Sequence, residues 1–154
     1  MNRRRVLFGV GSMGSLAGCI GGSDRLSGDD QSDQVFGVGE IEVVIDSEPV
    51  DLSADRFQAE HADDYAIEFH LHEFDDQWYM EGDRRVQVAE ALDMLPEFAF
   101  RVEDEGGVLR IDDETYDARD PDVSITIQVN DETVDPEAYI LDDGDDISVE
   151  VTTT

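Results

Sequence analysis

The sequence lacks lysine entirely and has a single cysteine. Its ten basic residues are all arginine, and they face 40 Asp and Glu, so the 154-residue chain carries a formal charge of −30. Without a basic patch the chain cannot neutralise a phosphate backbone, which excludes nucleic acid as a partner. One cysteine also excludes an internal disulfide and a metal site built from several thiolates.

Long hydrophobic runs are missing as well. The most apolar stretch, residues 6–20, is 15 positions long, and six of these are Gly or Ser. A membrane-spanning helix needs about 20 apolar residues, so this stretch is typical of the hydrophobic part of a signal peptide behind a basic start. The hydrophobic content of 40% is still enough for one folded core, and the length favours a single domain.

The residues that end this stretch carry a first resemblance. Leu16-Ala17-Gly18-Cys19 resembles a lipobox, and the Gly, Ser and Asp that follow at 21–24 are linker residues that argue against a buried core cysteine. The resemblance implies cleavage before Cys19 and a diacylglyceryl group on its thiol. It also implies a lipid anchor in the cell membrane, with the protein facing the extracellular side.

The basic start resembles a twin-arginine export signal. Arg3 and Arg4 precede the apolar pair Val6-Leu7, although Asn2 stands where Ser or Thr is usual and Val6 where Phe is usual. A third arginine blurs the register, so general secretory export stays open as the alternative. The Gly9–Gly14 segment also matches GxGxxG, but no strand precedes it and no βαβ unit follows, so a dinucleotide site is not expected.

These features divide the chain into a signal peptide (1–18), a lipidated flexible tether (19–34) and one globular domain (35–154). Removal of residues 1–18 takes away three Arg and no acid, so the formal charge of the mature chain is −33. Such charge repels itself in dilute buffer, whereas at ~1 M salt the Debye length falls to about 3 Å. The lysine-free, acidic composition resembles that of proteins from haloarchaea, so we expect a salt-requiring fold.

Within the domain the dominant hydrophobic period is two, which predicts strands. We expect one short helix over 88–95, where Val88, Leu92 and Leu95 share a stripe that Pro96 ends. Strands are predicted over 41–45, 65–72, 78–80, 98–102, 108–111 and 123–129, followed by a segment over 134–139 and a last extended segment over 141–151 around Gly144. Together they predict the α+β class, with a β-rich mixed sheet and one short helix.

The end of the chain carries a second resemblance. Ile127–Val134 followed by Tyr139-Ile140-Leu141-Asp142-Asp143-Gly144-Asp145-Asp146-Ile147 is similar to the end of β-grasp domains of the ThiS/MoaD sort. The resemblance implies a β-grasp-like C-terminal half whose last strand is central in the sheet. Asp131 replaces the usual Gly, and the sequence ends in Thr rather than in the Gly-Gly of sulfur carriers, so carrier chemistry is not implied. Asp142–Asp146 could also form a calcium loop, but its spacing favours a tight turn.

All three histidines lie within residues 61–72. His70 and His72 should project from the same face of a strand, about 7 Å apart along the backbone, with His61 returning from the preceding loop. Three imidazoles suit Zn²⁺ or Cu²⁺, and Glu60, Asp63 or Glu68 could add an oxygen. The alternative is a solvated sheet face, with Tyr65, Ile67, Phe69 and Leu71 on the core side. A layout like His61, His70-Leu71-His72 and the Asp-Gly-Asp ending also resembles some exported bacterial proteins, which adds interest to the histidines but implies no function.

These observations predict a lipid-anchored cell-surface binding module that takes a metal ion or a partner protein, with His61, His70 and His72 as the candidate ligands. A metal-dependent extracytoplasmic enzyme with Glu68 or Glu73 as base is the first alternative. A purely structural envelope lipoprotein is the second. The Trp78-Tyr79 pair is expected to pack in the sheet rather than to stack on a ligand.

Overall fold

The structure is a computed structural model that describes residues 34–73, 75–104 and 106–154. Cys19, Arg3 and Arg4 lie outside these residues, so the expected lipid anchor and export signal do too. The strands are β1 (Val35–Ile45), β2 (Glu48–Pro49), β3 (His70–Leu71), β4 (Gln77–Gly82), β5 (Phe98–Glu103), β6 (Gly106–Ile111), β7 (Glu114–Asp117), β8 (Val123–Val129), β9 (Glu132–Thr133) and β10 (Ile147–Thr153). The helices are α1 (Val88–Met94) and the 3₁₀ turns η1 (Asp55–Phe57) and η2 (Ala59–His61).

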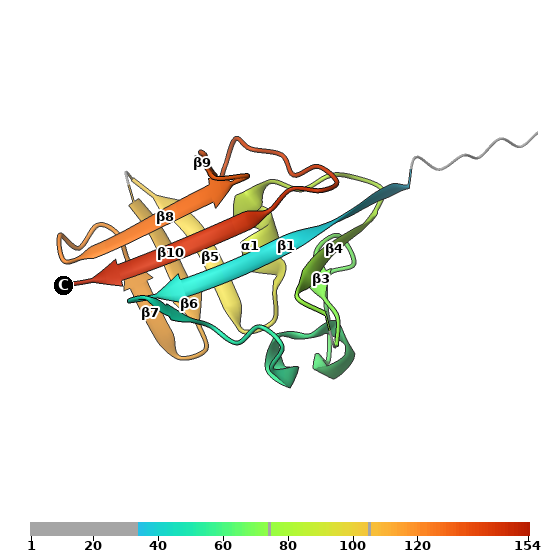
Figure 1. The fold of residues 1–154 in the computed structure, drawn as a ribbon, viewed down its shortest axis with the longest axis horizontal. Coiled ribbons are helices and arrows are strands. Elements are labelled where there is room, and N and C mark those ends of the chain that lie inside the picture. Colours follow the sequence, from blue (N-terminus) through green and yellow to red (C-terminus); the bar gives the residue numbers. More distant parts are fainter. Residues whose placement is uncertain (1–33, 74, 105) are drawn as a thin grey trace, which may run out of the picture. The chain divides into compact units, whose positions relative to one another are not determined.

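The larger sheet has the strand order β3-β4-β1-β10-β8-β9, with β2 added to β1 (Figure 1). Its central pair, β1 and β10, is parallel, and the other pairs are antiparallel. A second sheet, β5-β6-β7, is inserted between α1 and β8. The expected α+β class with a mixed, β-rich sheet and one short α-helix is confirmed.

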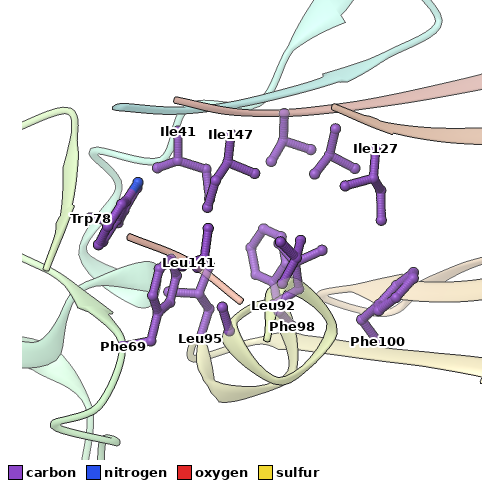
Figure 2. Close-up of a cluster of buried hydrophobic side chains, with 14 of the residues drawn as sticks. Ile41, Phe69, Trp78, Leu92, Leu95, Phe98, Phe100, Ile127, Leu141 and Ile147 are labelled. Atoms are coloured by element: carbon purple, nitrogen blue, oxygen red, sulfur yellow. The ribbon is translucent and has the colours of Figure 1, made fainter. Parts of the chain in front are cut away.

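The core lies between the inner face of the larger sheet, α1 and the second sheet. Figure 2 shows Leu92 and Leu95 facing Ile41 and Ile147 across this core, with Phe100 of β5 at its side. The helical stripe predicted from the sequence is therefore the buried stripe: Val88 and Leu92 are 0% exposed and Leu95 is 2% exposed. The Glu90 carboxylate accepts the Gln87 backbone N–H at 3.1 Å, which helps to satisfy the start of the helix.

The acidic turn before β10 ties the two central strands to β4. Gly144 has φ of +86°, a conformation that glycine adopts without strain, and its N–H donates to the Val38 carbonyl at 2.8 Å. Asp145 is 6% exposed, and its backbone oxygen accepts the indole N–H of Trp78 at 2.9 Å. The tight turn expected here is observed, and Trp78, which is fully buried, packs in the core as expected.

The strand predicted over residues 65–72 is much shorter than expected, since only His70 and Leu71 pair with β4. In a continued antiparallel register Glu68 would stand opposite Glu81, and like charges directly opposite each other destabilise a ladder. Instead the chain turns, and the Glu81 N–H donates to the Ile67 carbonyl at 3.1 Å. Tyr65 and Ile67, which the solvated-face alternative placed on the core side, are 45% and 50% exposed.

None of the helices in the described ranges is both long enough and apolar enough to cross a membrane.

Candidate functional site

Two dipeptides, Glu60-His61 in η2 and His72-Glu73 just after β3, face each other in crossed pairs. His72 Nδ1 lies 2.5 Å from Glu60 Oε1, and His61 Nε2 contacts Glu73 Oε1. Each pair joins residues 12 positions apart. The Glu73 backbone N–H also donates to the other Glu60 oxygen at 3.2 Å. These contacts fasten the 3₁₀ turns to the end of β3, in the green region of Figure 1.

His70 and His72 project on the same side, as the strand period predicted. Their Nε2 atoms are 3.1 Å apart, and the two rings meet edge to face. Leu71 and its β4 partner Trp78 are both in the core, so His70 and its partner Tyr79 belong to the opposite face of the sheet. The pair thus lies on the outer face, at the edge strand β3.

His70 is nevertheless only 1% exposed, so the solvated sheet face considered from the sequence is wrong for this residue. The rings of Tyr65, His72 and Tyr79 cover it, at centroid distances of 5.3, 4.7 and 6.1 Å. The covering residues come from the turn that replaced the expected strand (Tyr65), from β4 (Tyr79) and from the residue just after β3 (His72). His70 is therefore a buried polar side chain outside the main core.

Burial lowers the pKa of His70 below the usual 6.5, and the neighbouring His72 lowers it further. Glu81 and the backbone of Ile67 and Ala66 act in the opposite direction but do not outweigh burial. His70 is accordingly a neutral imidazole near neutral pH. A neutral imidazole is the form that ligates a metal ion.

The contact of His72 with Glu60 places one proton of the pair. A carboxylate only accepts hydrogen bonds, so His72 Nδ1 carries the proton that it shares with Glu60. The Nε2 atoms of His70 and His72 share the next hydrogen bond. The buried Nδ1 of His70 has no hydrogen-bond partner within the described part of the chain, although the backbone of Ala66 and Ile67 acts on this imidazole from nearby. A buried polar atom without a partner costs free energy.

Glu60 is held ionised at this place. Partial burial raises its pKa, but the hydrogen bonds from His72, from its own backbone N–H and from that of Glu73 outweigh burial, so the pKa lies below the usual 4.5. An ionised Glu60 keeps the His72 ring oriented, with Nε2 directed at His70. This is the arrangement in which an outer carboxylate orients a metal-binding histidine.

His61, the third candidate ligand, is not in this pair. Its Nε2 contacts Glu73 and lies 3.8 Å from Asp55 Oδ1. The hydrogen bond that His61 donates to Glu73 is the largest cause of a raised pKa at His61, and the charges of Asp55 and Glu60 raise it further. The structure therefore brings together two of the three predicted histidines and gives the third to a separate carboxylate group.

The oxygen donors suggested by the sequence differ in whether they contact a histidine. Of Glu60, Asp63 and Glu68, Glu60 contacts a histidine directly, and Glu73, considered only as a base, contacts another. Asp55 and the covering tyrosines Tyr65 and Tyr79 were not identified. The reciprocal order Glu-His at 60–61 and His-Glu at 72–73 is a sequence signal that would have indicated the crossed pairs.

Two hollows on the described surface lie elsewhere. The larger, about 660 Å³, is lined by side chains from β1, the β2 region and the start of β10, including the acids Glu40, Glu42, Asp51, Asp76, Asp131 and Asp146. The smaller, about 200 Å³, is mostly apolar and lies between β5–β6 and β8. Neither is lined by a histidine.

Comparison of the chain with protein-family models, curated proteins and solved structures found no match.

Proposed function

We propose that this domain is a metal-binding module in which the Nε2 atoms of His70 and His72 ligate one divalent transition-metal ion, Zn²⁺ or Cu²⁺. The observation that carries the proposal is their 3.1 Å separation. With metal–nitrogen bonds of about 2.0–2.1 Å, two ligands lie about 2.9 Å apart at a right angle and about 3.3 Å apart at the tetrahedral angle. The pair therefore already has the spacing of two neighbouring ligands.

The surroundings support the same proposal. Glu60 fixes the His72 proton on Nδ1, which leaves Nε2 free for a metal ion, and burial keeps His70 unprotonated. A metal ion on the His70 Nε2 would move that ring's proton to Nδ1, next to the backbone of Ala66 and Ile67. The unpartnered state of Nδ1 would then end. Water or a partner's side chain completes the coordination.

Binding is favoured over turnover because the histidines line neither of the two hollows described above. An enzyme with a histidine-bound metal would hold its ligands in a concave site with an open position for substrate. Here one ligand is buried beneath aromatic rings, and the other is at the surface, with its side chain 36% exposed.

Calorimetric titration of tag-free protein with Cu²⁺, Zn²⁺ and Ni²⁺ in high salt tests the proposal. We expect one tight Cu²⁺ or Zn²⁺ ion that is lost when His70→Asn and His72→Asn are combined, while His61→Asn, the matched control, retains it. His72→Asn alone serves if the double variant unfolds by circular dichroism. Equal loss in His61→Asn would indicate a three-histidine centre instead, and absence of binding by the wild type would refute the site.

We also propose that the module is lipid-anchored outside the cytoplasmic membrane of a salt-adapted cell. The lipobox ending in Cys19, the basic start at Arg3 and Arg4 and the lysine-free composition support this. Mass spectrometry of the native product should find an acylated Cys19 at its N-terminus, and Cys19→Ser should release the protein from membranes. An intact Met1 on a freely soluble product would contradict the anchor.

For the fold we propose a β-grasp-like domain with β5-β6-β7 as an insertion. Its support is the central position of the last strand, β10, beside β1, together with the Asp-Gly-Asp turn that precedes it. An experimental structure in which β10 lies at a sheet edge would contradict this assignment.

A further inference from the structure

The crossed pairing separates the histidines into two groups. Because Glu60 and His61 are neighbours in η2, their side chains reach different partners, His72 and Glu73. Glu60 orients the imidazole of the His70–His72 pair, whereas the Glu73 carboxylate approaches His61 Nε2 itself. A third donor, Asp55 Oδ1 from η1, lies 3.8 Å from the same nitrogen.

We propose that Asp55, His61 and Glu73 form a second cation site that takes a harder divalent metal ion, such as Mn²⁺. One atom from each of the three residues lies within 4.8 Å of the others. Three ligands that each lie about 2.1 Å from one ion are about 3.0–3.6 Å apart, so displacements of about 1 Å would assemble them. The His-Glu contact would open, and Asp55 would approach.

The charge around this group favours a cation. Arg56, which follows Asp55 in the chain, directs its guanidinium away to Asp112 at 2.9 Å. Two carboxylates, with Glu60 beside them, therefore surround a single imidazole. A dication on Nε2 would displace the proton of His61 into solvent, and it would supply two charges where the protonated imidazole supplies one.

The two sites should differ in metal preference. A pair of imidazoles favours Cu²⁺ or Zn²⁺, and with two nitrogens only it holds Mn²⁺ weakly. One imidazole with two carboxylates offers the oxygen ligands that suit Mn²⁺. Mn²⁺ is therefore a probe for the second site that leaves the proposed His70–His72 site empty.

The alternative is a purely structural role, in which the crossed pairs only fasten the 3₁₀ turns to β3. In that case His61 and Glu73 would contribute to folding and bind no ion. The two roles differ in one measurable quantity, since a fastening pair does not change the affinity for Mn²⁺.

Electron paramagnetic resonance of free Mn²⁺, titrated into metal-free full-length protein in high salt, tests the proposal. We expect one Mn²⁺ per chain, bound at least tenfold more weakly by Asp55→Asn and by His61→Asn. Asp64→Asn, an exposed acid nearby with the same loss of charge, should bind as the wild type does. Asp55 has an 82% exposed side chain, so its replacement should leave the fold intact.

The remaining outcomes separate the two sites. Unchanged Mn²⁺ binding in the combined His70→Asn and His72→Asn variant would support a distinct second site, even if Cu²⁺ binding at the pair fails. Loss of Mn²⁺ in that variant would mean a single shared site and overturn the inference. Equal weakening by Asp64→Asn and Asp55→Asn would reveal a diffuse cation atmosphere, and absence of Mn²⁺ binding would leave only the fastening role.

Discussion

The buried carboxylate of Asp145 should be the single most important acid for stability in this acid-rich chain. Its two oxygens accept hydrogen bonds from the Asp142 backbone N–H (2.9 Å), the Asn130 side-chain amide (2.8 Å) and the Tyr139 hydroxyl (3.2 Å). Burial and this carboxylate together raise the pKa of Tyr139, which keeps its hydroxyl protonated as a donor. The residue holds the turn that feeds the central strand β10.

Replacement by alanine would leave three donors without their acceptor. A hydrogen bond to a charged group contributes about 1.5–3 kcal/mol, but Asn130 and Asp142 are exposed and would regain water. Removing a buried charge also relieves its desolvation cost. We therefore expect Asp145→Ala to lower the free energy of unfolding by about 2–4 kcal/mol, and Asp145→Asn, which keeps one accepting oxygen, by about 1–2 kcal/mol.

Urea unfolding in high salt, followed by far-UV circular dichroism, measures these losses. Asp131→Asn is the matched control, because it removes the same charge from an exposed position in the neighbouring turn, where φ of +67° suits asparagine. The control should change stability by no more than about 0.5 kcal/mol. A loss from Asp145→Ala no larger than that of the control would refute the reasoning, since Asp145 would then be one more solvating acid.

Three further predictions follow from other parts of the molecule. Burial and the hydrogen bond to Glu114 raise the pKa of Tyr116 to about 12, so the folded state keeps this proton after the unfolded state has lost it near 10. The free energy of unfolding should therefore fall as the pH rises between these values. Tyr116→Phe should flatten that fall and remove the last step of an absorbance titration of the tyrosines. A Cβ on Gly39 would lie 2.1 Å from the Asp145 carbonyl and 2.8 Å from Trp78 Nε1, so Gly39→Ala should cost about 3 kcal/mol or more in urea unfolding, and a neutral result would contradict the packing of β1 on this turn. Dialysis from high to low salt should abolish the far-UV strand signal, and a melting temperature independent of salt would contradict the salt-adapted composition.

The elements that the sequence predicted well are those whose hydrophobic pattern is compatible with only one type of secondary structure. The helix over Val88–Met94 has a three-residue apolar stripe, and Pro96 follows its end closely. The alternation over 41–45 and over β8 continues long enough to require a half-buried strand, although β1 begins at Val35, six residues before the predicted strand. The short strand β7, over Glu114–Asp117, was not predicted because it has no apolar face of its own and depends on pairing with β6.

The stretch around Tyr65 and Ile67 shows where pattern reasoning stops. Its alternation was as regular as that of a real strand, but strand formation also needs a partner with compatible side chains. The continued register would have set Glu68 against Glu81, and local sequence does not reveal which residues will stand opposite one another. Here tertiary pairing decided between a strand and a turn.

Local sequence also predicted one part of the candidate site and missed another. The closeness of His70 and His72 follows from the two-residue period alone, and it needs no knowledge of the rest of the fold. The position of His61 depends on how the 3₁₀ turns lie against β3, and the expected single centre assumed that a nearby loop would return its histidine to the pair. Instead the neighbouring Glu60 reaches the pair and His61 faces away to Glu73.

A metal titration in high salt distinguishes direct ligands from the general attraction of the acidic surface. At ~1 M salt the Debye length is about 3 Å, so carboxylates farther from an ion than a direct ligand attract it very little. The formal charge of −30 on the chain then adds almost nothing to the affinity for a divalent cation. An ion that remains bound under these conditions is held by inner ligands, and its loss on replacing His72 or Asp55 identifies which ones. The same acids that make a cation atmosphere unavoidable in dilute buffer therefore cannot imitate a built site at high salt.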